Sequence, residues 1–93
     1  MKFECDKNKN EANIQRHGID FHDAALIFKA PVLVKADTRK DYREERLVGL
    51  GLLFGAVVVI VFTNRGNITR IISIRRANKY ERKIYQENFA EQD

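Results

Sequence analysis

Most of the residues of this chain that could do chemistry are cations, and they are concentrated in one stretch. Between positions 65 and 83 there are seven Lys and Arg against one acid, Glu81, a net charge of +6, whereas the whole chain carries +4. A planar guanidinium donates two parallel hydrogen bonds to phosphate oxygens, so the adjacent Arg75 and Arg76 are candidates for holding a phosphate group. Adjacent arginines are also typical of a solvated or partner-contacting surface. The pattern predicts a polyanionic partner for a surface made by Arg65, Arg70, Arg75, Arg76, Lys79, Arg82 and Lys83.

Few groups in the sequence could transfer a proton or bind a metal ion. His17 is a candidate because imidazole suits proton transfer near neutral pH, although a histidine before a glycine is also typical of the end of a helix. His22 is expected at the surface. The single Cys5 cannot form a disulfide within the chain, and Cys and His together are too few for a zinc site. We therefore expect no metal ion, no cofactor and a reducing compartment.

The segment at 47–62 has no charged residue and could be mistaken for a membrane span. A span needs about 20 such residues, whereas this segment has sixteen, with three glycines and a β-branched second half. Two buried strands joined at Phe54-Gly55 explain it better. The opening residues lack the apolar run of a secretory signal. We therefore expect a cytoplasmic protein with no membrane partner.

The pattern of polar and apolar residues predicts one α+β domain spanning 1–93, with N-terminal helices, an antiparallel sheet of about four strands and a C-terminal helix. N-capping residues, glycines and a proline set the expected boundaries. The expected elements are an extended segment at 2–5, a helix from Asp6 to about Arg16, a helix that begins after Asp20 and ends at Pro31, a strand at 32–35, a charged connection at 36–43, three strands within 45–76 that turn at Phe54-Gly55 and Arg65-Gly66, and a helix at 77–88 with Tyr80 in its buried face.

Three groups of motifs follow one another along nearly the whole chain. They are Phe3-Glu4-Cys5-Asp6, Lys9, Asn13 and Arg16-His17-Gly18; then Phe21, Ala24, Phe28, Glu45-Arg46, either Gly49 or Gly51, Thr63 and Arg65; then Arg70-Ile71-Ile72-Ser73-Ile74-Arg75-Arg76-Ala77 with Glu81-Arg82 and Tyr85. This ordered set resembles the BrnT family of small bacterial toxins, RelE-like ribonucleases of type II toxin–antitoxin modules. Two positions differ from the family's usual pattern, since Cys5 stands in place of Trp and Arg16 in place of Lys.

The resemblance implies a RelE/BrnT-like fold and an endoribonuclease that arrests growth without using a metal ion. Such cleavage needs a base for the 2′-hydroxyl, cations for the charge on the phosphorane and an acid for the leaving 5′-oxygen. The resemblance makes Arg75 and Arg76 the leading charge stabilisers, with Arg65 and His17 completing the catalytic set. The basic cluster and the resemblance together indicate the RNA contacts Arg16, Arg70, Lys79, Arg82 and Tyr85, the last because the resemblance implies a tyrosine of the closing helix, as in RelE-like toxins.

The resemblance also implies the partners. They are RNA as substrate and a separate BrnA-like antitoxin of the ribbon–helix–helix type, through which alone the toxin would contact DNA. Two other interpretations stay open: a non-catalytic module that holds nucleic-acid phosphates without cutting, and an interaction protein whose basic surface docks on an acidic partner. Growth arrest on expression separates the toxin from both, and salt-dependent RNA affinity separates the binding module from the interaction protein.

The predicted hairpin limits which arginines can share a site. A turn at Arg65-Gly66 puts Arg65 and Arg76 at opposite ends of the hairpin, on the order of 25 Å apart along the strand. Arg75 and Arg76 would point to opposite faces of the sheet. We therefore predict that RNA lies across the sheet, touches Arg70 midway and is cut nearest Arg75 or Arg76.

Overall fold

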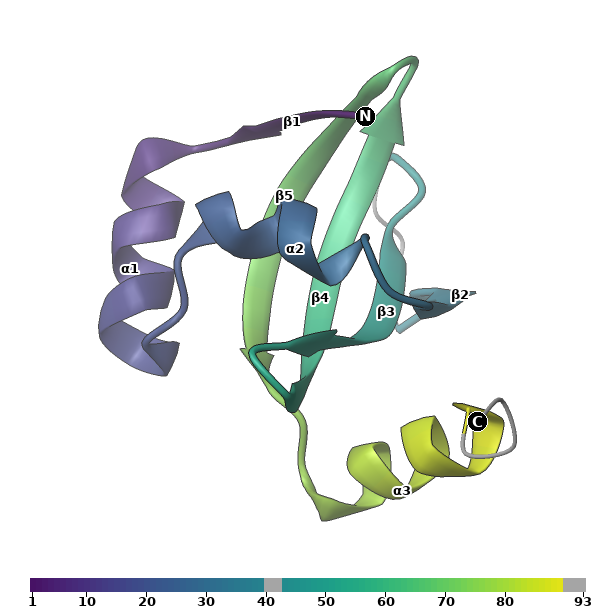
Figure 1. The fold of residues 1–93 in the computed structure, drawn as a ribbon. Helices are drawn as coiled ribbons and strands as arrows, with labels where there is room; N and C mark the ends of the chain where they lie inside the picture. Colours follow the sequence, from purple (N-terminus) through teal and green to yellow (C-terminus); the bar gives the residue numbers. More distant parts are fainter. Residues whose placement is uncertain (40–42, 90–93) are drawn as a thin grey trace.

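A computed structural model describes residues 1–39 and 43–89 of the chain. It shows one five-stranded sheet with helices packed against it (Figure 1), so the predicted α+β class is confirmed. The elements are β1 (Lys2–Cys5), α1 (Lys7–His17), the 3₁₀ helix η1 (Phe21–Asp23), α2 (Ala24–Ile27), β2 (Leu33–Ala36), β3 (Leu47–Leu53), β4 (Ala56–Arg65), β5 (Ile68–Arg76) and α3 (Lys79–Phe89).

The sheet is mixed, with strand order β1-β5-β4-β3-β2. Strands β2 to β5 pair antiparallel with their neighbours, as predicted, but β1 is a fifth strand that lies parallel to β5, with Lys2 opposite Ile68 and Cys5 opposite Ile71. The prediction of about four strands, all antiparallel, was therefore wrong at this edge. Nothing local in a four-residue segment reveals that it pairs with a strand 66 residues later in the chain.

Helix α1 begins and ends where the sequence predicted. The Asp6 side chain accepts a hydrogen bond from the backbone N–H of Lys9 at 3.0 Å, and Gly18, with a φ of 71°, ends the helix. Within α1 the buried residues are Asn10 and Asn13, and both side chains bond to backbone groups of other segments. A polar helix is therefore attached to the sheet mainly through amides.

The second predicted helix was too long. Asp20 does act as an N-cap, accepting from the backbone N–H of His22 at 2.9 Å, but a 3₁₀ turn and a single α-helical turn follow and end at Ile27. The residue before Pro31 is disfavoured in helical conformation, and the chain must also turn into β2. Both effects shorten the helix.

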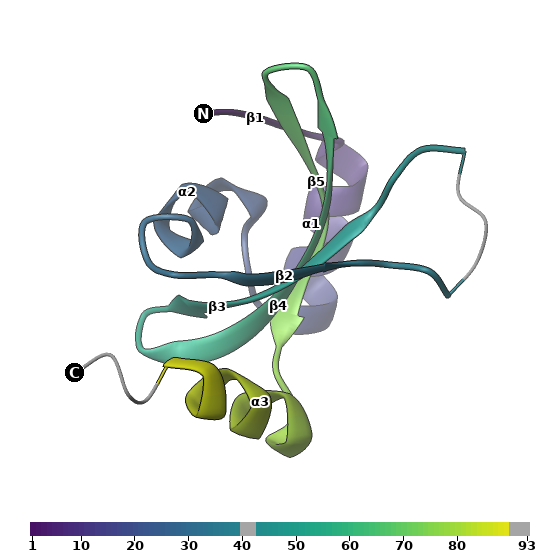
Figure 2. The same cartoon turned by 90° about the vertical axis from the view of Figure 1, so that its right-hand side faces the viewer.

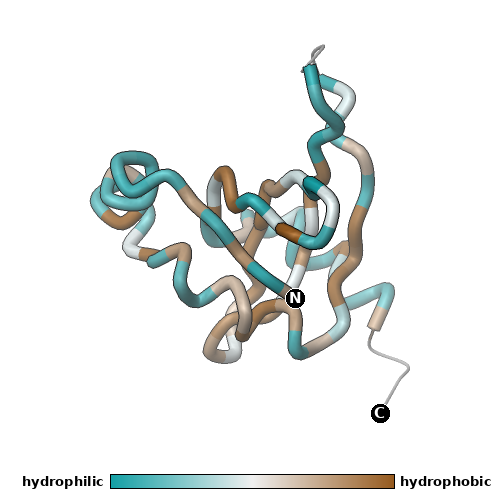
Figure 3. The backbone as a smooth tube through the Cα atoms, turned by 90° about the horizontal axis from the view of Figure 1, so that it is seen from above, coloured by the Kyte–Doolittle hydropathy of each residue, from teal (hydrophilic) through white to brown (hydrophobic). Residues whose placement is uncertain are grey.

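Apolar residues are buried on both faces of the sheet, and hydrophobic colour is concentrated along the central strands (Figure 3). One face is covered by η1 and α2, with α1 alongside β5; its buried residues are Ile19, Phe21, Ala24, Ile27, Leu53, Val58, Ile60, Phe62, Ile71 and Ile74. The other face packs against α3 through Leu50, Val57, Val59, Ala77 and Tyr85. Helix α3 lies across one end of the sheet, near the β3–β4 turn (Figures 1 and 2), so it covers only part of this second face.

Two glycines of β3 leave room for α2 and the segment after it to pack directly against the sheet. A Cβ at Gly51 would lie 2.7 Å from Cγ2 of Ile27, and a Cβ at Gly49 would lie 2.8 Å from Cγ1 of Val32. The charge-free segment at 47–62 therefore forms the two buried strands that were predicted, and the turn at Phe54-Gly55 is confirmed. Among the described residues, no helix has the length and apolar character needed to cross a membrane.

The β4–β5 hairpin turns one residue later than predicted. Arg65 pairs with Ile68, so the loop is Gly66-Asn67, and Gly66 has a φ of 61°. Glycine meets this positive-φ requirement without strain.

A bulge between Val61 and Phe62 shifts the register again along this hairpin. Arg70 consequently lies opposite Thr63, and Arg76 lies opposite Val58. Arg65, at the other end of β4, is about 23 Å along the strand from the position opposite Arg76. The two ends of the hairpin are therefore too far apart to hold one phosphate, as predicted.

Helix α3 starts two residues later than predicted and has a different buried face. Ala77 is extended and donates its N–H to the carbonyl of Val57 at 3.0 Å. Tyr80 is 73% exposed, whereas Tyr85 is 6% exposed. The prediction that Tyr80 packs in the core was wrong because Ala77, taken as the first residue of the repeat, lies outside the helix.

Candidate functional site

Three of the predicted site arginines share the sheet face that α3 partly covers, which we call the open face. Side chains alternate along a strand, and Ile71 and Ile74 point into the core on the opposite face. Arg70 and Arg75, each next to one of these residues, therefore point to the open face, as does Arg65, three residues after core residue Phe62. Arg65, Arg70 and Arg75 thus form a row from the hairpin tip to α3.

A hollow of about 400 Å³ lies on the open face beside α3, and we call it the α3-end hollow. Its floor is formed by the sheet residues Val48, Val59, Val61 and Ser73. Its rim is charged and comes from three segments, with Lys35, Asp37 and Arg39 from β2 and the residues after it, Arg75 from β5 and Glu81 from α3. The hollow therefore combines an apolar base with groups of both charges.

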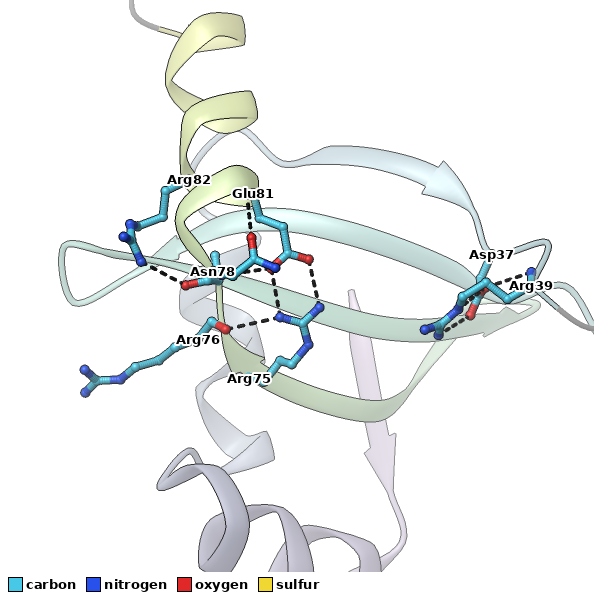
Figure 4. A network of polar contacts seen from close by, with 8 residues as sticks. Asp37, Arg39, Arg75, Arg76, Asn78, Glu81 and Arg82 are labelled. Atoms are coloured by element: carbon cyan, nitrogen blue, oxygen red, sulfur yellow. Dashed lines mark hydrogen bonds and ion pairs between the residues drawn. The ribbon is translucent and has the colours of Figure 1, made fainter.

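Arg75 and Glu81 form a two-pronged ion pair at this hollow (Figure 4). Nη1 and Nη2 of Arg75 donate to Oε1 and Oε2 of Glu81, both at 2.8 Å. The Glu81 carboxylate also accepts from the backbone N–H of Asn78 at 2.9 Å, while Oδ1 of Asn78 accepts from the N–H of Glu81 at 2.8 Å. This reciprocal pair is a capping box, so one carboxylate both starts α3 and ties it to β5.

Electrostatics keep both members of this pair charged. Hydrogen bonds from Arg75 lower the pKa of Glu81, and the hydrogen bonds to Glu81 raise the pKa of Arg75. The positive charge of Lys35 also lowers the pKa of Glu81, and the positive charge of Arg39 lowers the pKa of Arg75. Residues from β2 and from the segment after it therefore influence the pair across the hollow.

Arg39 is attached to the rim by its own carboxylate. Its Nε and Nη2 donate to Oδ1 and Oδ2 of Asp37, both at 2.9 Å (Figure 4). The Asp37 side chain is only 1% exposed, whereas that of Arg39 is 75% exposed. The buried acid thus orients an exposed guanidinium beside the hollow.

At the other end of the open face lies the hairpin-tip cluster, formed by Glu4, Glu44, Arg65 and Arg70. Nε and Nη2 of Arg65 donate to Oε2 of Glu44 at 3.0 and 2.9 Å. Nη1 of Arg70 donates to Oε1 of Glu4 at 3.3 Å, and Arg65 approaches the same oxygen at 4.0 Å. Each arginine here has a carboxylate partner.

Arg76 points away from the Arg75–Glu81 pair (Figure 4) and lines a smaller hollow of about 140 Å³ together with Gly18, Asp23 and Phe54. Gly18 directly follows His17, the last residue of α1. The motif Arg16-His17-Gly18 therefore lies near Arg76 and on the other side of the sheet from Arg75. The structure brings these two arginines to different surfaces, as their alternation predicted.

The remaining predicted RNA contacts lie on α3 and differ in exposure. Lys79 and Arg82 are exposed, and Nη1 of Arg82 donates to the carbonyl of Ala77 at 3.1 Å. Tyr85 packs in the core: its hydroxyl donates to the carbonyl of Pro31 at 3.3 Å, and burial raises its pKa. Its ring centroid lies 4.7 Å from that of Phe89, with the two rings tilted by 47°. Tyr85 thus lies between α3 and the sheet and does not line the α3-end hollow.

Sequence reasoning did not place Lys35, Asp37, Arg39 or Glu81 in the site. The first three were assigned to a strand and to a charged connection with no role, and Glu81 was noted only as the single acid of the basic stretch and as part of a family motif. Residues 40–42 of that connection lie outside the described residues. Cys5, which replaces the family's usual Trp, packs against the core on the α2 side of the sheet.

The described residues contain no group of three or more His, Cys, Asp and Glu side chains that could hold a metal ion. His22, predicted at the surface, is exposed and bonds through Nδ1 to Oδ1 of Asp20 at 2.7 Å.

Comparison with known protein families gives one match. A family model described as "Ribonuclease toxin, BrnT, of type II toxin-antitoxin system" matches residues 5–81, which include α1, strands β2 to β5 and the Arg75–Glu81 pair. No curated protein matches the chain.

Proposed function

Because this chain belongs to the BrnT family of ribonuclease toxins of type II toxin–antitoxin systems, we propose that it is an endoribonuclease that cleaves cytoplasmic RNA without a metal ion and thereby arrests growth. A toxin of this type acts with a protein antitoxin, and a ribonuclease acts on RNA, so membership gives both partners in general terms.

The observation that carries the proposal is the α3-end hollow. Cleavage by attack of a 2′-hydroxyl develops negative charge on the phosphorane, which donors fixed in advance can stabilise. Arg75, Lys35 and Arg39 supply cations around the hollow, and the apolar floor lowers the local polarity in which they act. Arg75 is held in place before substrate arrives, because Glu81 fixes its guanidinium.

We propose that a single RNA strand lies along the open face and that the cut falls at Arg75. Arg70 would contact a phosphate midway along the sheet, and the exposed Lys79 and Arg82 would contact phosphates beside α3. Arg16, His17 and Arg76 would reach only the part of the strand that passes around the end of β5. Arg65 has no part in this proposal because it lies at the hairpin tip and does not line the α3-end hollow, and Tyr85 has none because its ring is buried.

We further propose a BrnA-like antitoxin of the ribbon–helix–helix type as the neutralising partner, with DNA contacted only through it. An antitoxin that covers the open face would block the α3-end hollow. This part of the proposal rests on family membership alone.

The test is expression of this chain alone in a bacterium, with growth and total RNA integrity as readouts. The test variant carries Arg75→Ala and Arg76→Ala. The matched control carries Lys7→Ala and Lys9→Ala, which removes the same charge from α1. Circular dichroism and thermal melting establish that both variants are folded.

Growth arrest with RNA loss in the wild type and in the lysine control, abolished in the arginine variant, is the expected result. Unimpaired growth and intact RNA with soluble, folded wild-type protein would contradict the ribonuclease proposal. In that case salt-dependent RNA affinity would identify a non-catalytic binding module.

A further inference from the structure

We propose that Glu81 is the general base of the cleavage reaction and that the substrate phosphate activates it by taking over the guanidinium of Arg75. This inference rests on the proposed function and names the residue that removes the proton from the 2′-hydroxyl.

The position of Glu81 favours this role. In the part of the chain that the structure describes, arginines of the open face pair with Glu4, Glu44 and Glu81, and of these three carboxylates only that of Glu81 borders the α3-end hollow. A base must lie within hydrogen-bond reach of the hydroxyl that it deprotonates. A phosphate bound to Arg75 would bring its ribose next to this carboxylate, because the two side chains are 2.8 Å apart.

In the free protein both oxygens of Glu81 are occupied by Arg75, and this contact lowers the pKa of the carboxyl. A carboxylate in that state is ionised but weakly basic. A phosphate oxygen that accepts the hydrogen bonds of Arg75 removes the main cause of the lowered pKa and adds a neighbouring negative charge. Both changes raise the basicity of Glu81 when substrate is bound.

The backbone contact of Glu81 keeps the carboxylate in position during this exchange. Oε1 retains the hydrogen bond from the N–H of Asn78, so the side chain need not move when Arg75 turns to the phosphate. Oε2, whose hydrogen-bond partner is Arg75, becomes available. Arg75 can turn without leaving the hollow, since its Nη1 already donates to the carbonyl of Arg76 at 3.2 Å.

The chemical step balances without an external reactant. The 2′-hydroxyl proton passes to Glu81, O2′ forms a bond to phosphorus, and the bond from phosphorus to O5′ breaks. The leaving 5′-oxygen takes a proton from water, and Glu81 returns its proton to the solvent. One fragment ends in a 2′,3′-cyclic phosphate and the other begins with a 5′-hydroxyl.

The other charged groups that face Glu81 come from three segments. They are Lys35 on β2, Asp37 and Arg39 after it, and Arg75 on β5. Asp37 is bound by Arg39, and no carboxylate of the rim other than Glu81 contacts Arg75 in the described part of the chain. Glu81 is therefore the rim carboxylate whose basicity depends on where Arg75 binds.

The experiment measures cleavage of a mixed-sequence single-stranded RNA by the purified full chain, and binding of the same sequence as uncleavable DNA. Glu81→Gln keeps an oxygen that can accept from Asn78 but cannot take a proton. We expect its cleavage rate at saturating RNA to fall about 10²- to 10⁴-fold, with affinity for the DNA analogue unchanged or higher because Arg75 is released. The matched control is Glu87→Gln, which removes the same charge from an exposed position of α3 that pairs with Lys83, so its rate should stay within a few-fold of wild type.

The wild-type pH profile tests the same idea without a variant. The acid limb of kcat, which reports the RNA complex, should lie at higher pH than the acid limb of kcat/KM, which reports the free protein. Coincident limbs, or Glu81→Gln that cuts at the wild-type rate while Arg75→Ala does not cut, would overturn the assignment of Glu81 and leave the ribonuclease function intact. Wild-type protein that neither cuts RNA nor arrests growth would overturn both proposals.

Discussion

The two ends of the open face contain the same kind of ion pair in different surroundings. At the hairpin tip, Arg65 and Arg70 face Glu44 and Glu4, two cations against two acids. At the other end, Arg75 faces Glu81 beside a hollow that also contains Lys35, Asp37 and Arg39, so cations exceed acids. The proposal that Arg75 binds substrate therefore requires that the additional cations and the concave surface at this end compensate for the loss of its partner.

The largest expected difference between the two ends is in RNA cleavage. Arg75→Ala should lower kcat by about 10²- to 10³-fold, the usual effect of removing one fixed donor to a developing anion. Arg65→Ala should change it less than about threefold, because this guanidinium lies at the far end of β4 and does not line the α3-end hollow. Rates for both variants on one RNA, at equal folded concentration, provide the measurement. Equal losses would show that the whole open face acts as one site.

A second difference is expected in stability. Asn13 is 6% exposed and bonds to the carbonyls of Ile19 and Ile74 at 3.0 and 2.8 Å, and it accepts from the N–H of Ile74 at 3.2 Å. β1 stops pairing with β5 at Ile71, and the Asn13 side chain satisfies the backbone groups of Ile74 further along the same edge, next to Arg75. Asn13→Ala leaves these buried backbone groups without partners and should cost about 2–4 kcal/mol in the free energy of unfolding.

The matched control for Asn13 lies at the hairpin tip. Asn64 is exposed and accepts one hydrogen bond, from the Thr69 hydroxyl at 2.9 Å. Asn64→Ala should therefore cost less than about 1 kcal/mol. Urea unfolding of both variants measures the difference, and a large loss for Asn64→Ala would mean that the tip is held as tightly as the α3 end.

The structure also shows why some features could be predicted from sequence. The cap at Asp6, the stop at Gly18, the turn at Phe54-Gly55 and the division of 47–62 into two strands all follow from short-range signals. The opposite orientation of Arg75 and Arg76 follows from strand alternation alone. These predictions needed no knowledge of which distant segments meet.

Several of the features that sequence missed depend on distant segments. The pairing of β1 with β5 joins segments 66 residues apart, whereas the capping box of Asn78 and Glu81 at the start of α3 is a local signal that was missed. The α3-end hollow brings Lys35 from β2 to Arg75, 40 residues later. No local pattern identifies such neighbours, so sequence supplied one arginine of the site but not the carboxylates around it.

The α3 end should also respond to acid more than the tip does. The folded pKa of Glu81 is lowered from its ordinary value of 4.5, so its pairing stabilises the fold above about pH 4.5, and that contribution is lost as the pH falls below this value. The melting temperature of the wild type should thus exceed that of Glu81→Gln at pH 6, with the gap narrowing toward pH 3. Glu44→Gln at the tip should melt close to wild type throughout, as expected for an exposed pair. If the difference in melting temperature between the wild type and Glu81→Gln did not change with pH, the charge of Glu81 would contribute nothing to stability.

The smallest expected effect compares the hairpin turns at the two ends of the sheet. The tip turn places Gly66 where φ is positive, whereas the β3–β4 turn, at the end near Arg76, places Phe54 there with a φ of 50° and 79% exposed. A bulky residue in this conformation is strained, and asparagine is favoured. Phe54→Asn should therefore raise the free energy of unfolding by about 0.5–1 kcal/mol, whereas Phe54→Leu, which keeps the strain, should not. A loss of stability in Phe54→Asn would show that the exposed ring makes a stabilising contact and that the turn at this end is not strained.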